Sequence, residues 1–468
     1  MRPAACEVIL VSPYELGRQP FALAEPAALL AGEGFRVTCI DLSLQKLDSI
    51  AWRDAALVAI YLGMHTATRI ALEALPRIRA LAPRARLCAY GLYAPMNAAL
   101  LQACGAGKVI GGEFEPELLA AARDARDGGT GVAAAAPVVY RGKVDFVVPE
   151  RAGLPPLERY ARLVLPDGAE KTVAFAEASR GCKHWCRHCP VVPVYQGHFR
   201  AVPSPIVLAD IRQQVARGAQ HVSFGDPDFL NGPTHALRIV RALHAEFPAL
   251  TWDATIKVQH LIEHAGLLPE FKESGCLFIT SAAEAVDDRI LEHLAKNHTC
   301  ADFERAVALL RAAGIAFAPT FVAFTPWITL EGYAALLESL ARLDLIENVP
   351  PVQLTIRLLV PAGSHLLKLP GFSDLLDPFD AGILGYPWRH RDPRVDRLQQ
   401  ALQDFVAREE TQSLGRAEVF AEIWRMAHVA LGRIAAAPAI GRANRAIPRL
   451  SEPWYCCAEP TSQQLAAI

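Results

Sequence analysis

The segment ASRGCKHWCRHCPVVPVYQG, residues 178–197, contains three cysteines within a span of eight residues. Cys182, Cys186 and Cys189 have the spacing C-x3-C-x2-C, and two histidines stand between them. Because thiolates are strong ligands for soft metals, this density of thiols indicates a metal centre. The charged and polar residues between the cysteines argue against three thiols packed in an apolar core.

Several kinds of centre are compatible with this spacing. A structural zinc ion needs four closed ligands, and His184 or His188 would have to complete the set from the same tight loop. A thioredoxin-like redox pair would use Cys186 and Cys189 and leave Cys182 idle. A 4Fe–4S cluster has four irons, so three thiolates leave one iron open to a substrate or cofactor. The last interpretation explains why there are three cysteines.

A second pair of thiols stands near the end of the chain, in WYCCAEP, residues 454–460. Adjacent thiolates such as Cys456 and Cys457 can bind one soft, thiophilic atom together. The pair could also supply an auxiliary cluster ligand, or a thiol that reduces or traps an intermediate. The alternative without function is one packed thiol and one incidental neighbour.

Composition limits the class of protein. The chain has 468 residues, 52% of them hydrophobic, and a formal net charge of −2, which gives no global basic field for nucleic acid or an anionic membrane. The 11 cysteines are an odd, scattered set rather than a disulfide framework. Without a signal-peptide pattern or an apolar run of about 18 residues, we expect a cytoplasmic protein with no membrane partner.

The elements that must position these thiols form two series. In residues 1–127, short apolar runs alternate with amphipathic helical segments, which predicts a doubly wound α/β domain of flavodoxin-like strand order. A Gly- and Ala-rich segment, residues 128–150, is predicted to be a linker. The expected strands of the first domain are residues 6–12, 35–42, 56–63, 86–92 and 108–112.

The second series, residues 151–365, predicts a partial (βα)6 barrel. Its expected strands are residues 172–178, 221–226, 250–256, 276–282, 315–324 and 352–360. The cysteine cluster directly follows the first of them, at the carboxyl end where barrels place their chemistry. Residues 366–468 are predicted to be a helical extension that carries the Cys-Cys tail.

These motifs together resemble the radical S-adenosylmethionine (SAM) enzymes, which carry C-x3-C-x2-C on the loop after the first strand of a partial (βα)6 barrel. The resemblance implies a 4Fe–4S cluster on the three cysteines and SAM bound at the open iron. Gly225, Asp226 and Pro227 in FGDPDF take the place of the turn that binds the amino group of SAM. Glu284 would lie near the ribose or the substrate.

The same resemblance suggests roles for three further residues. Arg357, in LTIRLLVPAGS, is expected to pair with the SAM carboxylate. His188 precedes the last cysteine, where the family often has an aromatic residue that packs near the adenine. We expect Trp185 to anchor the loop by burial.

The first domain is similar to that of the radical SAM subgroup with an N-terminal cobalamin-binding-like domain. The likeness rests on the Gly112-Glu113-Phe114-Glu115 turn, but D-x-H-x-x-G, the histidine motif of base-off cobalamin proteins, is absent from SPYELGRQP. Two outcomes stay open, a bound cobalamin and a domain without it. The tail resembles that of Cys-Cys-Ala-Glu-Pro-tail radical SAM proteins, which implies that it reaches the active site, with Glu459 exchanging a proton.

The resemblance thus implies an enzyme of the transferase type that reductively cleaves SAM to modify a small-molecule substrate by radical methyl or other group transfer. The vicinal dithiol would hold that substrate. An external electron donor of the flavodoxin or ferredoxin type is the expected protein partner, and no nucleic acid is expected. The alternative function is a zinc- or metalloid-binding sensor without SAM chemistry.

Overall fold

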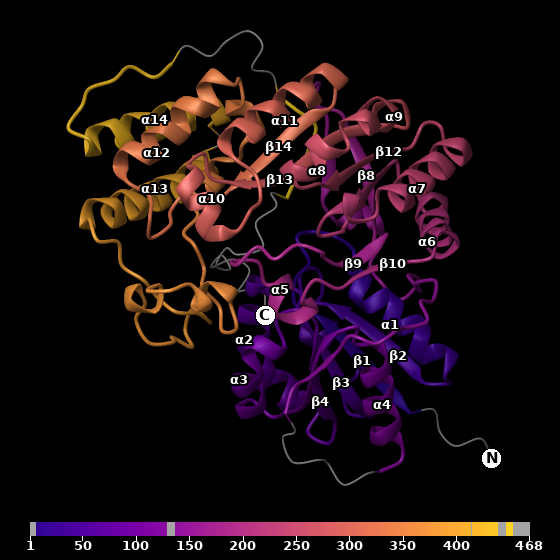
Figure 1. Ribbon diagram of the computed structural model, residues 1–468. Coiled ribbons are helices and arrows are strands. Elements are labelled where there is room, and N and C mark those ends of the chain that lie inside the picture. Colours follow the sequence, from indigo (N-terminus) through magenta and orange to yellow (C-terminus); the bar gives the residue numbers. More distant parts are fainter. Residues whose placement is uncertain (1–5, 129–135, 413, 439–445, 453–468) are drawn as a thin grey trace.

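A computed structural model describes residues 6–128, 136–412, 414–438 and 446–452. Two sheets organise this part of the chain. In Figure 1 the first sheet and its helices lie below the second, and β9, β10 and the short helix α5 lie between them.

The first sheet has the strand order β2-β1-β3-β4-β5-β6, and all of its pairs are parallel. The first five strands have the flavodoxin-like order, as predicted. Their apolar runs are buried on both faces, which is typical of a parallel sheet covered on both sides. The strands are β1 (Glu7–Ser12), β2 (Arg36–Asp41), β3 (Ala55–Tyr61), β4 (Arg86–Tyr90), β5 (Ala106–Gly112) and β6 (Val138–Tyr140).

Helices cover both faces of this sheet. Apolar side chains of α1 and α4 pack in one cluster, and those of α2 and α3 pack in another. These helices are α1 (Phe21–Gly32), α2 (His65–Leu81), α3 (Ala98–Ala103) and α4 (Glu115–Arg126). Strand β6 was not expected, because its three residues fall in the segment predicted to be a linker.

The second sheet has the order β14-β13-β12-β11-β8-β7-β15. The five strands from β8 to β14 are parallel, and β7 and β15 extend the sheet with antiparallel pairs. The strands are β7 (Arg162–Val164), β8 (Glu170–Ala176), β11 (His221–Phe224), β12 (Thr251–Thr255), β13 (Cys276–Glu284), β14 (Ala316–Phe321) and β15 (Arg449–Leu450). A separate antiparallel pair is β9 (Ser179–Gly181) and β10 (Phe199–Ala201).

Helices follow the parallel strands, and those from α6 to α12 share one large core with them. They are α5 (Val191–Tyr195), α6 (Ser204–Ala216), α7 (Pro233–Glu246), α8 (Val258–Glu263), α9 (Leu268–Glu273), α10 (Asp288–Leu294), α11 (Cys300–Ala313) and α12 (Leu330–Arg342). Helix α11 shows why they begin where they do. The side chains of Thr299 and Asp302 form a capping box at its start, and Gly314 ends it with φ +68°.

The predicted sixth strand is largely irregular. Residues 351–354 form a 3-10 helix, and only a single bridge between Phe324 and Arg357 extends the sheet beyond β14. Pro350 and Pro351 explain the difference, because proline cannot donate to a strand ladder. Beyond this point α13 (Pro393–Gln412) and α14 (Arg416–Ala430) contribute apolar side chains to the same core, so the C-terminal region is helical there as predicted.

Candidate active site

The cysteine loop follows β8 and β9 and is fixed to the end of α10. The backbone N–H of Arg187 donates to the carbonyl of Leu294 over 2.9 Å. The Arg187 guanidinium donates to the carbonyls of Glu292 (3.0 Å) and His293 (2.9 Å). A cation thus satisfies carbonyls that a helix leaves free at its C-terminus. The loop is thereby held at the carboxyl edge of the parallel strands.

The three cysteines lie close together but do not enclose a single ion. Cys186 is buried, and Cys182 and Cys189 are half-buried. In the described part of the chain, two groups of three side chains have metal-binding atoms that all lie within 4.8 Å of one another. The three cysteines are not one of these groups. Tetrahedral zinc at a Zn–S distance of 2.3 Å would place its sulfurs about 3.8 Å apart. At least two of the three sulfurs are therefore farther apart than one tetrahedral zinc ion allows, and the zinc alternative is not supported.

Burial disfavours the charged thiolate form of Cys182 and Cys189. It raises the pKa of Cys182, and it raises the pKa of Cys189 to about 12, with the neighbouring cysteines adding to the effect. The thiols are therefore protonated at neutral pH in the absence of a metal. Binding of a cluster must release their protons.

Two buried lysines face the cysteines. Nζ of Lys257, a residue that is 7% exposed, donates to Sγ of Cys186 over 3.6 Å. Lys296 is 3% exposed, and its charge interacts with both Cys186 and Cys189. Buried ammonium groups require nearby negative charge, which three metal-bound thiolates supply. Neither lysine was predicted from the sequence; Lys257 lies just after strand β12 at the predicted site edge, and Lys296 follows α10 without such a signal.

Glu284 ends β13 in a strained position. Its φ is +68°, which is rare for a residue with a side chain, and such strain gathers at functional sites. Burial raises its pKa, but Lys296 and His188 together outweigh this effect and hold the pKa at about 2. Oε1 lies 3.0 Å from Nε2 of His188 and 3.3 Å from Nζ of Lys296. Glu284 and His188, both predicted site residues, thus lie together beside the cysteine loop.

The predicted SAM-binding turn, Gly225 to Pro227, follows β11. Oδ2 of Asp226 accepts the backbone N–H of Ala178 over 3.0 Å, and Oδ1 accepts the hydroxyl of Ser179. Asp226 therefore holds the chain that leads into the cysteine loop. Burial raises its pKa to about 7. A side chain added at Gly225 would meet the ring of Phe175 at 2.1 Å, so glycine is required for close packing there.

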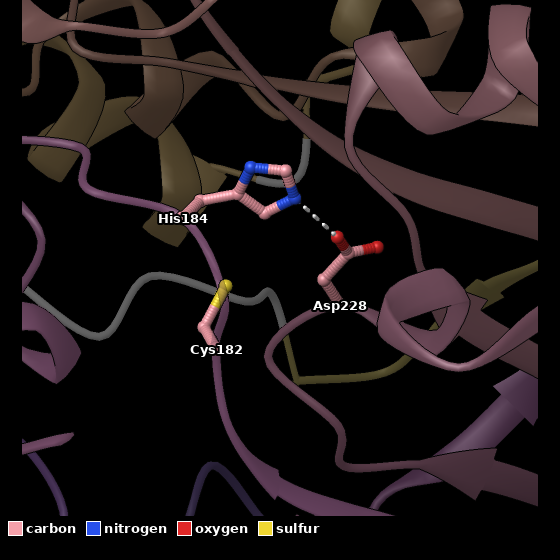
Figure 2. A group of neighbouring side chains, drawn as sticks. All are labelled: Cys182, His184 and Asp228. Atoms are coloured by element: carbon pink, nitrogen blue, oxygen red, sulfur yellow. Dashed lines mark ion pairs between the residues drawn. The ribbon is translucent and has the colours of Figure 1, made fainter. Parts of the chain in front are cut away.

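Behind Cys182 lies a buried cluster of one carboxylate and two histidines. Figure 2 shows Cys182, His184 and Asp228, and Nε2 of His184 is 3.3 Å from Oδ2 of Asp228. Nδ1 of His260 lies 2.7 Å from the same oxygen. Burial raises the pKa of Asp228, but the two histidines outweigh this and lower it. The sequence analysis placed His184 only as a neighbour of the metal and missed its two partners.

Arg180 connects the cysteine loop to the first sheet. Its side chain is 6% exposed and contacts four buried or half-buried carboxylates. They belong to Glu25, Glu113, Glu115 and Glu177. Burial raises the pKa of Glu113 to about 7, and the neighbouring Glu115 adds to this effect, although Arg180 and Arg200 oppose it. The Gly-Glu-x-Glu turn is thus an anchor between the two sheets.

A cavity of about 170 Å³ lies at this junction, where cobalamin would have to bind. Ligand pockets usually have 300–1,000 Å³. The ring of Tyr61 occupies the space above the strand ends, within 2.7 Å of a side-chain carbon added at Gly63 and 2.8 Å of one at Gly91. The residues in this arrangement therefore do not fit a corrin unless Tyr61 moves, and no chemical step below depends on cobalamin.

Two other predicted residues have different surroundings from those expected. Arg357 stacks on the ring of Trp388 at 3.5 Å and pairs with Asp396 at 2.7 Å, so its guanidinium is already engaged with the C-terminal region. Trp185 is 51% exposed, and the expectation that it anchors the loop by burial is wrong. It stacks on His365, with ring centroids 5.9 Å apart.

Cys456, Cys457 and Glu459 lie outside the described residues. The described chain ends at Glu452, directly after β15, and Glu452 accepts a hydrogen bond from the hydroxyl of Tyr14. Strand β15 is antiparallel to β7, and β7 is antiparallel to β8. It follows that β15 runs in the direction of β8, toward the edge that carries the cysteine loop. In the described ranges, no helix has the length and apolar character of a membrane span.

Comparison with known proteins agrees with this geometry. Residues 177–329 match the model of the radical SAM superfamily. The tRNA-2-methylthio-N(6)-dimethylallyladenosine synthase of Escherichia coli O139:H28 is 26% identical over 199 residues, which are 40% of this chain and 41% of that protein. The enzyme of that name from Haemophilus influenzae is 24% identical over 201 residues, 41% of this chain and 42% of that protein. The chain thus spans about two fifths of the length of these relatives.

Two solved structures share the fold over most of this chain. The radical SAM methyltransferase TsrM from Kitasatospora setae covers 73% of this chain and 72% of its own, with 21% identity and a TM-score of 0.57. The cobalamin-dependent SAM radical enzyme OxsB covers 86% of this chain and 67% of its own, with 14% identity and a TM-score of 0.65. Residues 177–329 of this chain thus match a radical SAM domain, and the likeness to these two solved structures shows that the chain shares their fold.

Proposed function

We propose that the chain binds a 4Fe–4S cluster through Cys182, Cys186 and Cys189 and reductively cleaves SAM to transfer a methyl or other carbon group to a small-molecule substrate. The main support for this proposal is that Lys257 and Lys296 lie beside the cysteines of the loop. Lys296 pairs with the buried carboxylate of Glu284, and Lys257 gains a counter-charge when the thiolates beside it bind a metal. The nine cysteines in the described ranges are free, which is consistent with the reducing cytoplasm.

A cluster held by Cys182, Cys186 and Cys189 would supply the one-electron chemistry for cleavage of a carbon–sulfur bond of SAM, with the electron coming from an external flavodoxin- or ferredoxin-type donor. The chain's own residues prepare the site for this chemistry. Lys257 and Lys296 offset the negative charge of the thiolates. Arg187 and Asp226 fix the loop from two sides, so that its sulfurs keep their positions.

Glu284 is suited to hold a polar group of SAM or of the substrate. With its pKa at about 2, it is an ionised acceptor at neutral pH. It can accept hydrogen bonds from hydroxyl or ammonium groups without taking up a proton. His188 directly precedes Cys189 in the chain, and its Nε2, 3.0 Å from Oε1 of Glu284, fixes the position of the carboxylate. We propose the turn Gly225–Pro227 and Arg357 as further SAM contacts.

We propose that the substrate is held by Cys456 and Cys457, with Glu459 exchanging a proton. The direction of β15 and the anchoring of Glu452 by Tyr14 support this. Cys456 is four residues past Glu452, and an extended chain covers at most about 3.6 Å per residue, or roughly 14 Å. Two adjacent thiols suit a substrate with a soft, thiophilic atom.

Anaerobic reconstitution with iron and sulfide tests the proposal. We expect about four irons per chain with the broad visible absorbance of a 4Fe–4S cluster. After reduction with dithionite, the protein should convert SAM to a cleaved fragment. Stoichiometric zinc without SAM turnover would instead identify a metal-binding sensor.

A further inference from the structure

We propose that His260, Glu263 and His264 bind a divalent transition metal such as Zn²⁺, at a site separate from the cysteine cluster. One ligand atom of each residue lies within 4.8 Å of the others. His260 and Glu263 belong to α8, and the N–H of His264 donates to the carbonyl of His260, which continues the helical turn. Side chains three and four residues apart lie on the same face of a helix.

The donor set matches the chemistry of zinc. Two imidazoles and one carboxylate hold catalytic zinc in several enzymes and leave a fourth position open to water. The spacing H-x-x-E-H is also one of the known zinc-binding helix patterns. His260 is buried, His264 is half-buried and Glu263 is exposed, so one side of the site opens to solvent. A metal can therefore enter, and a small ligand can reach the open position.

Asp228 provides the second observation that points to a metal. Metal-binding histidines usually give their other ring nitrogen to a carboxylate, which fixes the tautomer. Nδ1 of His260 lies 2.7 Å from Oδ2 of Asp228, whose side chain is fully buried. The second carboxylate oxygen of Asp228 accepts the backbone N–H of Lys257 over 3.3 Å, which fixes its orientation. We therefore assign Nε2 of His260 to the metal.

A hydrogen bond also orients the carboxylate ligand of the site, Glu263. Nε2 of Gln259 donates to Oε1 of Glu263 over 2.7 Å. This contact restricts the rotation of an exposed side chain and leaves Oε2 for the metal. Both a histidine and the carboxylate of the site thus have a partner that sets their direction before any metal binds.

The other close group, Cys182, His184 and Asp228, is a weaker assignment. A metal there would compete with the cluster for Cys182. The α8 site uses no cysteine. It contacts the cysteine loop through Asp228, which lies 3.3 Å from Nε2 of His184 (Figure 2), and through His260, whose ring centroid is 4.7 Å from that of His184. Metal binding at α8 would hold Asp228 and, through it, the first turn of the cysteine loop.

The test uses the full chain with its cluster reconstituted, dialysed against Zn²⁺ and analysed for iron and zinc together. We expect one zinc per chain in addition to about four irons. Glu263→Gln and His264→Ala should each lose the zinc and retain the iron. Asp228→Asn should weaken zinc binding roughly 10- to 100-fold. His244→Ala, at a half-buried histidine of α7, is the matched control and should change neither metal.

Two controls separate this site from zinc bound by thiols. The double variant Cys456→Ala/Cys457→Ala should keep the zinc. Substitution by Co²⁺ should give visible ligand-field bands without the strong sulfur-to-metal charge transfer of a thiolate site. Absence of zinc from the wild-type protein, or full zinc in Glu263→Gln and His264→Ala, would overturn the assignment. Iron content and SAM cleavage report on the cluster independently.

Discussion

Nζ of Lys257 lies 3.6 Å from Sγ of Cys186, and both side chains are buried. A positive charge at this position favours the reduced, more negative state of a cluster. Lys257→Met removes the charge and keeps the chain length. We expect about four irons to be retained and the reduction potential to fall by on the order of 60 mV, which for one electron is about tenfold in the equilibrium constant.

The potential is measured by an anaerobic titration followed by electron paramagnetic resonance. Lys272→Met is the matched control, because Lys272 is exposed on α9 and should leave the potential unchanged. An unchanged potential in Lys257→Met with full iron content would contradict the proposed proximity of the ammonium group to the cluster.

The three cysteines give the most direct prediction. Replacing Cys182, Cys186 or Cys189 by alanine should remove the cluster, because two thiolates cannot hold it against exchange with solvent. We expect iron to fall well below four per chain and SAM cleavage to be lost. Cys104→Ala, at a half-buried cysteine of the first domain, should change neither quantity. Full iron and SAM cleavage in any of the three variants would remove the assignment.

The sequence was sufficient to predict the order of the first sheet and the position of the cysteine loop. Parallel strands that are buried on both faces appear as continuous apolar runs, and right-handed crossovers leave few possible orders. The predicted strand at residues 352–360 was wrong in its first half. There the apolar run was read as a strand although two prolines precede it, and the segment forms a 3-10 helix.

The partners of the cysteines were harder to predict, because they come from loops far apart in the sequence. Lys257 follows β12 and Lys296 follows α10, and only the curvature of the sheet brings both to one place. A single lysine after a strand is common, so its burial against a thiol becomes visible only in three dimensions. Glu284 and His188 were predicted individually, but their hydrogen bond and the role of Lys296 were not.

The pair of Glu284 and Lys296 should contribute to stability. Both are buried, and their charged groups are 3.3 Å apart. Glu284→Gln leaves the ammonium of Lys296 without its carboxylate, which should lower the free energy of unfolding by about 3 kcal/mol. Glu270→Gln, which breaks an exposed pair with Arg241, should lower the free energy of unfolding much less, because solvent screens that pair. The two variants are compared by denaturant unfolding; equal losses would argue against a buried pair.

The raised pKa of Asp226 predicts that the free energy of unfolding depends on pH. Burial raises its pKa to about 7 from an ordinary value of 3.8, so the folded state holds a proton that the unfolded state releases. Its contribution to stability is therefore full below pH 3.8 and is lost as the pH rises through about 7. Asp226→Asn imitates the protonated form and should flatten the stability profile between pH 4 and 7. An unchanged slope, measured by unfolding at several pH values, would contradict the raised pKa.

Variants of Cys456 and Cys457 can show whether the C-terminal tail acts in SAM cleavage or in a later step that uses the SAM fragment. Because the cluster needs only Cys182, Cys186 and Cys189, the double variant Cys456→Ala/Cys457→Ala should cleave SAM at a rate close to that of the wild type. It should lose the binding of a trivalent arsenical, a thiophilic probe that two adjacent thiols hold together. Cys300→Ala, at a half-buried single cysteine, should bind the probe as the wild type does. If the double variant still binds the probe with wild-type stoichiometry, the dithiol does not hold the substrate. If it also loses SAM cleavage, the tail acts on the cluster itself.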